Sequence, residues 1–190
     1  MRKRALLAAA ALFATLGAWQ VASAAWIHAK GRLAQELLAI SWQRGQAHDL
    51  APRPWPGADL RPMARLTVPS RGVSLFVLDA AHGRALAFGP AVLPGTPLPG
   101  GEGNSVLVAH RDTHFAFVRR LALDDEIDVE TLQGSRKRYR VREMRVVDKH
   151  DLAVAQPTGR AQLTLVTCYP FDALRPGTPL RYVVVADRTT

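Results

Sequence analysis

The chain has 190 residues, of which 48% are hydrophobic and 22% charged, and its formal net charge is +9. This composition is that of a globular protein and excludes a disordered one, and the length suits one compact domain with a tail. Cys168 is the only cysteine, which excludes an internal disulfide and any zinc or iron–sulfur site built from several cysteines of this chain. A basic chain could bind nucleic acid, but no helix-turn-helix, zinc-finger or RNA-binding signature is present, so we expect no nucleic-acid partner.

The N-terminal segment carries the pattern of an exported protein. Arg2-Lys3-Arg4 precedes an uncharged run from Ala5 to Ile27, which at about 1.5 Å per residue is long enough to span a bilayer. Residues 1–27 are therefore predicted to be a basic cytoplasmic cap and a single-pass anchor in the inner (cytoplasmic) membrane, with the remaining chain on the outer, periplasmic side. Ala22-Ser23-Ala24 leaves open a cleaved signal peptide. A buried soluble helix is disfavoured because the run has no polar face.

Residues 28–62 are predicted to connect this segment to the domain. Apolar residues recur at helical spacing from His28 to Gln46, which indicates an amphipathic helix. It either packs on the domain or lies on the membrane surface. A proline-rich linker, Pro52 to Gly57, cannot continue the helix. We expect the main domain to begin at Met63 and to cover residues 63–190.

Beyond the linker the pattern is mainly β. A closed barrel or a sandwich is predicted from eight short runs: Ala64–Val68, Val73–Leu78, Ala85–Phe88, Ser105–His110, Glu126–Leu132, Lys137–Val147, Gln162–Cys168 and Arg181–Ala186. Within these residues only Phe115 to Leu121 reads as a short helix, which disfavours a doubly wound fold. The sixth run alternates basic and apolar residues and changes phase near Glu143, which predicts a bulge there. Its basic face is predicted to be solvated, with contact to anionic lipid headgroups as the alternative.

Three strand ends carry candidate chemistry. Cys168 ends one apolar run, and the proline that follows at position 170 stops the strand there. Taken alone, a cysteine in an apolar strand is usually an inert small hydrophobe. His110, however, ends another apolar strand, and an imidazole beside a thiol is a nucleophile–base pair. Arg181 opens the next strand and carries a permanent charge that suits an oxyanion.

Two other side chains are alternatives for the roles of His110 and Arg181. His114 lies four residues after His110, beyond the strand end, which favours a place in the loop or short helix. Arg175 lies in a loop rich in proline and glycine, which favours substrate contact over a fixed oxyanion donor.

These segments resemble the sortase family of cysteine transpeptidases. The run Leu163-Thr164-Leu165-Val166-Thr167-Cys168 is similar to the sortase Thr-Leu-x-Thr-Cys signature, and Val108 to Phe115 resembles the histidine segment of the family. Leu93 to Gly100 resembles the loop found before that segment in class D-like sortases. The resemblance covers Leu66 to Ala186, and Ala109 stands where most relatives have glycine. The tyrosine and proline after Cys168 are most similar to sortases of Gram-negative bacteria.

The resemblance implies an eight-stranded sortase-type β-barrel with short helices, preceded by the transmembrane and amphipathic helices. It also implies a thiol protease chemistry, hydrolytic at peptide bonds, in which Cys168 attacks a Leu-Pro-x-Thr-Gly-like sorting signal near the C-terminus of an exported protein. The thioester is then passed to an amine acceptor of the cell envelope. His110 and Arg181 complete the catalytic set, Thr167 and Arg175 contact the substrate, and neither metal nor organic cofactor is required.

Two other classes of function stay open. Another cysteine hydrolase would also use a cysteine and a histidine, although the sequence lacks a histidine-glycine-cysteine cluster and a cysteine at a helix start. A non-catalytic exported β-barrel that binds a partner would leave Cys168 as an unreactive packing residue.

Overall fold

The computed structural model describes residues 2–48, 50–173, 175 and 177–189, without the side chains of residues 2, 4–12, 24, 27, 28 and 30–32. The chain divides into two compact units, Met1–Glu36 and Leu37–Thr190. Each unit is described by itself. The second unit holds every strand described below and all of the candidate site.

Helix α1 runs from Arg2 to Gln46 and includes the segment predicted to be an amphipathic helix. Among the described residues, no helix is both long enough and apolar enough to cross a membrane, so the anchor predicted from Ala5 to Ile27 is not confirmed. Several side chains of that run, those of residues 5–12, 24 and 27, lie outside the described part of the chain.

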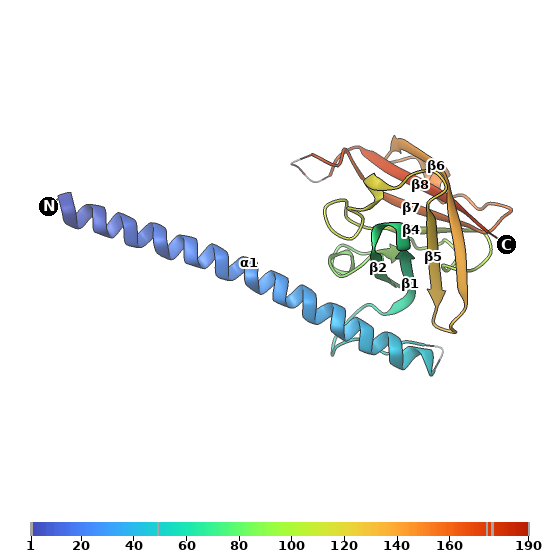
Figure 1. Ribbon diagram of the computed structural model, residues 1–190, viewed down its shortest axis with the longest axis horizontal. Coiled ribbons are helices and arrows are strands. Elements are labelled where there is room, and N and C mark those ends of the chain that lie inside the picture. The colour runs from blue at the N-terminus through green and yellow to red at the C-terminus, as the bar shows by residue number, and fades with distance from the viewer. Residues whose placement is uncertain (1, 49, 174, 176, 190) are drawn as a thin grey trace. The chain divides into compact units, whose positions relative to one another are not determined.

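The second unit is a closed barrel, as predicted. Its strands within the described residues are β1 (Pro62–Val68), β2 (Val73–Leu78), β3 (Ala91–Val92), β4 (Asn104–Val108), β5 (Glu126–Thr131), β6 (Arg136–Asp148), β7 (Gln162–Tyr169) and β8 (Leu180–Arg188). Around the barrel they follow the order β1-β2-β3-β4-β7-β8-β6-β5. Figure 1 shows β4, β7 and β8 side by side. The β4–β7 pair is parallel and the β7–β8 pair antiparallel.

Two local predictions are wrong. Ala85–Phe88 is not a strand: Ala85–Ala87 form a short 3-10 helix, η2, and the Phe88 N–H donates to the Ala85 carbonyl at 2.8 Å. The strand that completes the barrel is instead β3, whose two residues are too few to show an alternating pattern. The helix expected over Phe115 to Leu121 is reduced to one 3-10 turn, η3 (Val118–Arg120).

Two apolar clusters sandwich the strands that carry the site. Inside the barrel, Leu163 and Leu165 of β7 belong to the main core together with Val184 of β8. The alternate side chains point outward into a second cluster, which consists of Val106, Val166, Val183 and Val185, with Leu93, Val108, Val147, Val154 and Ala155 packed against it. Because side chains alternate along a strand, Cys168 lies on the same outer face as Val166.

The end of α1 belongs to the packed barrel unit. Leu38 is fully buried in a cluster with Leu60, Leu78 and Ala91. Trp42 packs against Phe76 at a centroid distance of 5.9 Å. The segment from Leu37 to the first strand therefore packs on the barrel and is part of the same compact unit.

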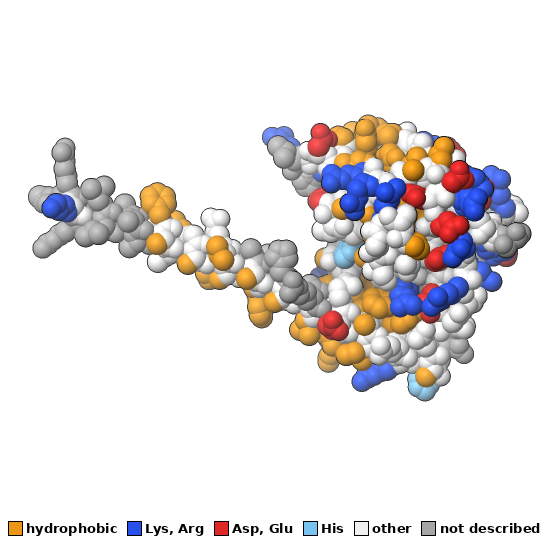
Figure 2. All heavy atoms as spheres, in the orientation of Figure 1, with side chains coloured by type: hydrophobic (Ala, Val, Ile, Leu, Met, Phe, Trp, Pro, Cys, Tyr) orange, Lys and Arg blue, Asp and Glu red, His pale blue; other side chains and the backbone are white. Residues whose placement is uncertain are grey.

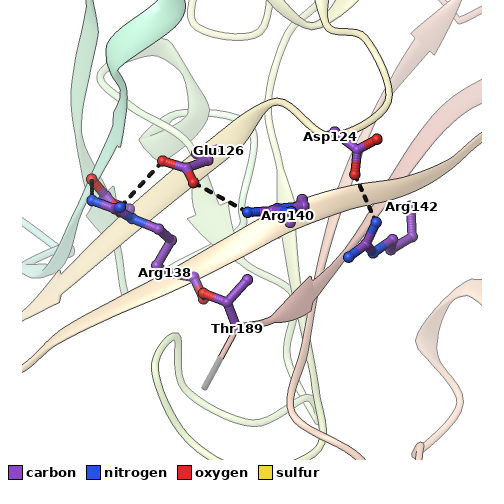
Figure 3. A network of polar contacts seen from close by, with 7 residues as sticks. Asp124, Glu126, Arg138, Arg140, Arg142 and Thr189 are labelled. Carbon is purple, nitrogen blue, oxygen red and sulfur yellow. Dashed lines mark hydrogen bonds and ion pairs between the residues drawn. The ribbon is translucent and has the colours of Figure 1, made fainter.

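The bulge expected near Glu143 is confirmed, because the β6–β8 register shifts between Val141 and Glu143. The basic face of β6 is paired with acidic groups at and before β5. Arg138 bonds Asp128 at 2.8 Å and also meets Glu126, while Arg142 bonds Asp124 at 2.7 Å (Figure 3). The hydrogen bond with Asp128, together with the charge of that carboxylate, raises the pKa of Arg138. Figure 2 accordingly shows basic and acidic side chains intermixed on the barrel surface, as expected for a solvated ladder of charges.

Candidate functional site

Cys168 and Arg181 lie opposite each other on neighbouring strands. The antiparallel register of β7 and β8 pairs the Cα atoms of these two residues. Side chains directly opposite in such a ladder lie on one face of the sheet, with Cβ atoms about 4.5–5.5 Å apart. Cys168 is partly exposed and is the penultimate residue of its strand. The sulfur therefore lies at the end of β7, on the face that also carries the Arg181 side chain.

His110 reaches the same end of the sheet from β4. The parallel β4–β7 register aligns Val108 with Val166, so two further residues along each strand bring His110 level with Cys168. The pairing continues past the last strand residue, since the Ala109 N–H donates to the Val166 carbonyl at 3.3 Å. His110 itself is exposed. Three residues from separate parts of the sequence thus lie at the same end of the outer face.

Thr167 lies behind this site. Its side chain is 2% exposed, and its hydroxyl donates to the Ala109 carbonyl at 2.7 Å. The residue before the thiol is thereby joined to the residue before the imidazole. The structure assigns Thr167 a bracing contact, while its predicted contact with substrate stays a prediction.

The guanidinium of Arg181 is held at the base of the β7–β8 loop (residues 170–179). Its Nη1 donates to the carbonyls of Thr178 and Leu180, both at 2.8 Å. A guanidinium also carries N–H groups on Nε and Nη2, which can serve another acceptor. Arg175 lies in the same loop and is exposed, so its predicted contact with substrate also stays a prediction.

His114, the rival imidazole, packs against the segment before β3. Its Nε2 lies 3.3 Å from the Ala87 carbonyl. Burial lowers the pKa of His114, the hydrogen bond with Ala87 opposes this, and the nearby His110 charge lowers it further. His114 thus lies in the loop after the strand end, as predicted, and its ring contacts the segment before β3.

Arg111 is a residue of this site that the sequence did not single out for a role. It follows His110, yet only 7% of it is exposed, and its guanidinium bonds the β7–β8 loop. From the sequence, an arginine in a polar cluster after a strand looks like an ordinary surface residue. Its burial depends on a loop more than 60 residues later in the chain.

The Leu93-Pro94-Gly95-Thr96 segment forms a turn beside β4, where the Leu93 N–H donates to the Val106 carbonyl. The Thr96 hydroxyl and N–H both donate to the Leu93 carbonyl, at 2.8 and 3.2 Å. Gly95 has a φ of 85°, which suits glycine. The Leu93 side chain packs on the outer apolar cluster, so this turn extends that cluster beside Val106.

A large cleft lies elsewhere on the barrel, with a volume of about 700 Å³. Its walls come from β5, β6 and the end of β8, namely Glu126, Asp128, Arg136, Lys137, Arg138, Arg140, Arg188 and Thr189. None of Cys168, His110 or Arg181 lines it. Chemistry and not volume therefore locates the candidate site, since a thiol, an imidazole and a guanidinium together can activate a nucleophile and stabilise an oxyanion. Among the described residues no group of three or more His, Cys, Asp or Glu side chains is placed to hold a metal ion.

Known proteins share this barrel. The crystal structure of sortase C-1 from Actinomyces oris is 31% identical, with a TM-score of 0.61 over 68% of this chain and 75% of that one. Sortase A from Corynebacterium diphtheriae is 26% identical, with a TM-score of 0.63 over 70% of this chain and 63% of that one.

The sequence comparisons agree with the structural ones. Sortase D of Bacillus subtilis (strain 168) is 27% identical over 126 residues, which is 66% of this chain. The match spans 63% of the length of that relative. Residues 66–189 match the model of the sortase domain. Because this match extends over more than half of the sequence, the chain belongs to the sortase family.

Proposed function

We propose that this chain is a cysteine transpeptidase that cleaves a Leu-Pro-x-Thr-Gly-like sorting signal and transfers the acyl part to an amine. The supporting observation is the register that places Cys168 opposite Arg181 and level with His110. Membership of the sortase family agrees with this chemistry, as does the description of a similar structure, a Clostridium perfringens sortase D5, as a transpeptidase.

The reaction follows from the three side chains. The Cys168 thiolate attacks a backbone carbonyl of the signal, and the negative charge that develops on the oxygen accepts hydrogen bonds from the free N–H groups of Arg181. The C–N bond breaks as protonated His110 gives its proton to the leaving amine. This step leaves a thioester on Cys168. A primary amine then attacks the thioester and restores the thiol, whereas attack by water gives hydrolysis.

The surroundings of the thiol suit an extended peptide with an apolar N-terminal part. The outer apolar cluster continues from Val166 toward Leu93, Val154 and Ala155, which provides a surface for the leucine and proline of a signal. Arg175 on the β7–β8 loop is exposed and is proposed to contact the peptide from the other side. Substrates of this class would be exported proteins, and the acceptor would be an amine of the cell envelope.

We further propose that the domain works outside the cytoplasm, tethered to the inner membrane. This proposal is based on the Arg2-Lys3-Arg4 cluster and the uncharged run from Ala5 to Ile27 that follows it. Cell fractionation of the full chain, together with protease protection of spheroplasts, tests it. Recovery of the full chain from the soluble fraction would contradict the tether, and protection of the barrel in spheroplasts would contradict the outward placement.

Mass spectrometry of the intact protein tests the chemistry. The full chain is incubated with peptides that carry candidate sorting signals, with and without a primary amine. We expect a mass increase equal to the N-terminal part of the peptide on Cys168, and its loss when the amine is added. The Cys168→Ala variant is the matched control and should give no adduct. An unreactive thiol with every peptide and with iodoacetamide would instead favour the non-catalytic binding domain.

A further inference from the structure

Arg111 is a buried cation that donates three hydrogen bonds to one distant loop. Its Nη2 donates to the carbonyls of Ala173 at 2.6 Å and Arg175 at 3.1 Å. Its Nη1 donates to the Thr178 hydroxyl at 3.3 Å. All three acceptors lie in the β7–β8 loop, between the strand whose penultimate residue is Cys168 and the strand whose second residue is Arg181. One side chain therefore ties the loop to the strand end of His110.

Because the Arg111 guanidinium is buried, these hydrogen bonds couple its position to the conformation of the loop. A buried guanidinium is unfavourable unless its N–H groups are satisfied. The ion pair of Arg111 is with Asp112 at 3.2 Å, but that carboxylate side chain is 74% exposed and thus well screened by water. Backbone carbonyls of the loop therefore supply much of the compensation. The loop must keep its conformation for Arg111 to stay buried, and Arg111 must stay in place for the loop to keep its conformation.

We call the hydrogen bonds from Arg111 to Ala173, Arg175 and Thr178 the clasp. Thr178 connects this clasp to the candidate oxyanion donor, Arg181. Its hydroxyl accepts from Arg111, while its carbonyl accepts from Nη1 of Arg181 at 2.8 Å. The hydrogen bonds that link the His110 strand end to Arg181 thus pass through one residue, Thr178, which accepts from the guanidinium of Arg111 and from that of Arg181. Moving the loop away from Arg111 would displace one of the two carbonyls that orient the Arg181 side chain.

We propose that Arg111 is a positioning residue that fixes the β7–β8 loop against the His110 strand and so sets the placement of Arg181 relative to the imidazole. This inference rests on the proposed transpeptidase function. Arg111 itself touches neither the substrate nor the reacting atoms in this assignment. It acts through the loop, so its loss should weaken the chemical step more than the capture of the peptide.

The test compares Arg111→Lys and Thr178→Val with a matched control, Arg142→Lys, which alters an exposed ion pair on β6. Lysine keeps the charge but lacks the planar fork that serves three acceptors. We expect Arg111→Lys to lower kcat for peptide transfer about 10- to 100-fold, as misplacement of a catalytic group does, with KM little changed. Thr178→Val should shift kcat in the same direction by less, and Arg142→Lys should leave it unchanged. Circular dichroism and thermal melting establish that each variant is folded at the assay temperature.

Hydrogen exchange of the loop amides gives a readout that needs no activity. The clasp predicts faster exchange in the β7–β8 loop of Arg111→Lys than in the parent protein, with exchange in β1 and β2 unchanged. A folded Arg111→Lys protein with parental kcat, or with parental loop exchange, would overturn the inference. If the parent protein forms no thioester while the loop exchange changes as expected, the proposed enzyme activity fails and the clasp stands as a purely conformational device.

Discussion

The Thr167 hydroxyl and the Ala109 carbonyl form the contact that joins the thiol strand to the imidazole strand. Both groups are buried, and their bond is 2.7 Å long. A second buried threonine bond lies further along the same two strands, where the Thr164 hydroxyl donates to the side-chain oxygen Oδ1 of Asn104, also at 2.7 Å. The two bonds have similar geometry and burial but differ in their distance from Cys168, so they separate an effect on stability from an effect on catalysis.

Thr167→Val should lower both stability and activity. Valine has the shape of threonine but leaves the buried Ala109 carbonyl without its donor, which destabilises by about 1–3 kcal/mol. His110 is the next residue, so thioester formation per folded molecule should fall as well. Urea unfolding and peptide turnover measure the two effects. Thr164→Val is the control and should lose stability alone. Equal activity loss in both variants would contradict a specific brace at Thr167.

His114 should make stability depend on pH. Burial lowers its pKa in the folded state below the unfolded value of about 6.5. As the pH falls below that value the unfolded chain binds a proton that the folded chain resists, so the free energy of unfolding decreases. The expected result is a lower urea midpoint at pH 5 than at pH 7.5, and a smaller difference in His114→Gln. An identical difference in both proteins would assign the pH dependence to other groups.

Short irregular connections determine how the barrel closes between β2 and β4. The two residues of β3 bridge a parallel contact with β2, Leu78 to Ala91, and an antiparallel contact with β4. The chain reaches β3 through Gly89, which passes very close to β2. A Cβ atom built on Gly89 would lie 2.8 Å from the Phe76 carbonyl oxygen and 3.3 Å from the Leu78 side chain. A glycine is therefore needed for close approach at this position.

Gly89→Ala should separate β3 from β2. The added methyl group meets a backbone oxygen that has little freedom to move, and overpacking of this type destabilises by about 1–3 kcal/mol. Thermal melting should show a lower Tm, with the earliest exchange of amides near β3. Gly83→Ala is the matched control, since nothing lies within 4 Å of its Cβ position. A Tm equal to the parent for Gly89→Ala would show that the contact relaxes without strain.

The sequence predicted those elements that repeat a pattern over several residues. β6 and its bulge were found because polar and apolar residues alternate and then change phase near Glu143. β3 is too short for alternation, and the apolar run of η2 looks like a strand although it forms a turn. Cys168, His110 and Arg181 were predicted as site residues because each lies where an apolar run ends or begins. Arg111 was missed because its burial depends on a loop that is distant in the sequence.

The packed unit begins at Leu37, well before the first strand. Leu38 and Trp42 are almost fully buried, one against the β2–β3 region and the other against Phe76 and Leu132. Nothing in the helical spacing of this segment separates packing on a barrel from packing on a membrane surface, which is why the sequence left both alternatives open. The predicted domain boundary at Met63 is best tested by truncation.

A chain that starts at Leu37 should be more stable than one that starts at Met63. Burial of a side chain such as Leu38 contributes about 1.5–3 kcal/mol, and Trp42 adds a comparable amount. For a domain of this size each lost kcal/mol lowers Tm by roughly 2–4 °C, so the shorter chain should melt roughly 6–24 °C below the longer one. Calorimetry of both proteins provides the measurement. Matching Tm values would support a domain confined to residues 63–190.

The parallel pairing of β4 with β7 also has a consequence for biosynthesis. Such a pair cannot form until the intervening segment of the chain is available, and Arg181 belongs to β8, which follows β7. Contacts between residues distant in the sequence form late in folding. A nascent or truncated chain that ends before β8 thus presents a thiol without its full set of partners. The proposed peptide-cleaving activity would therefore arise only after β8 has been synthesised and has paired with β7.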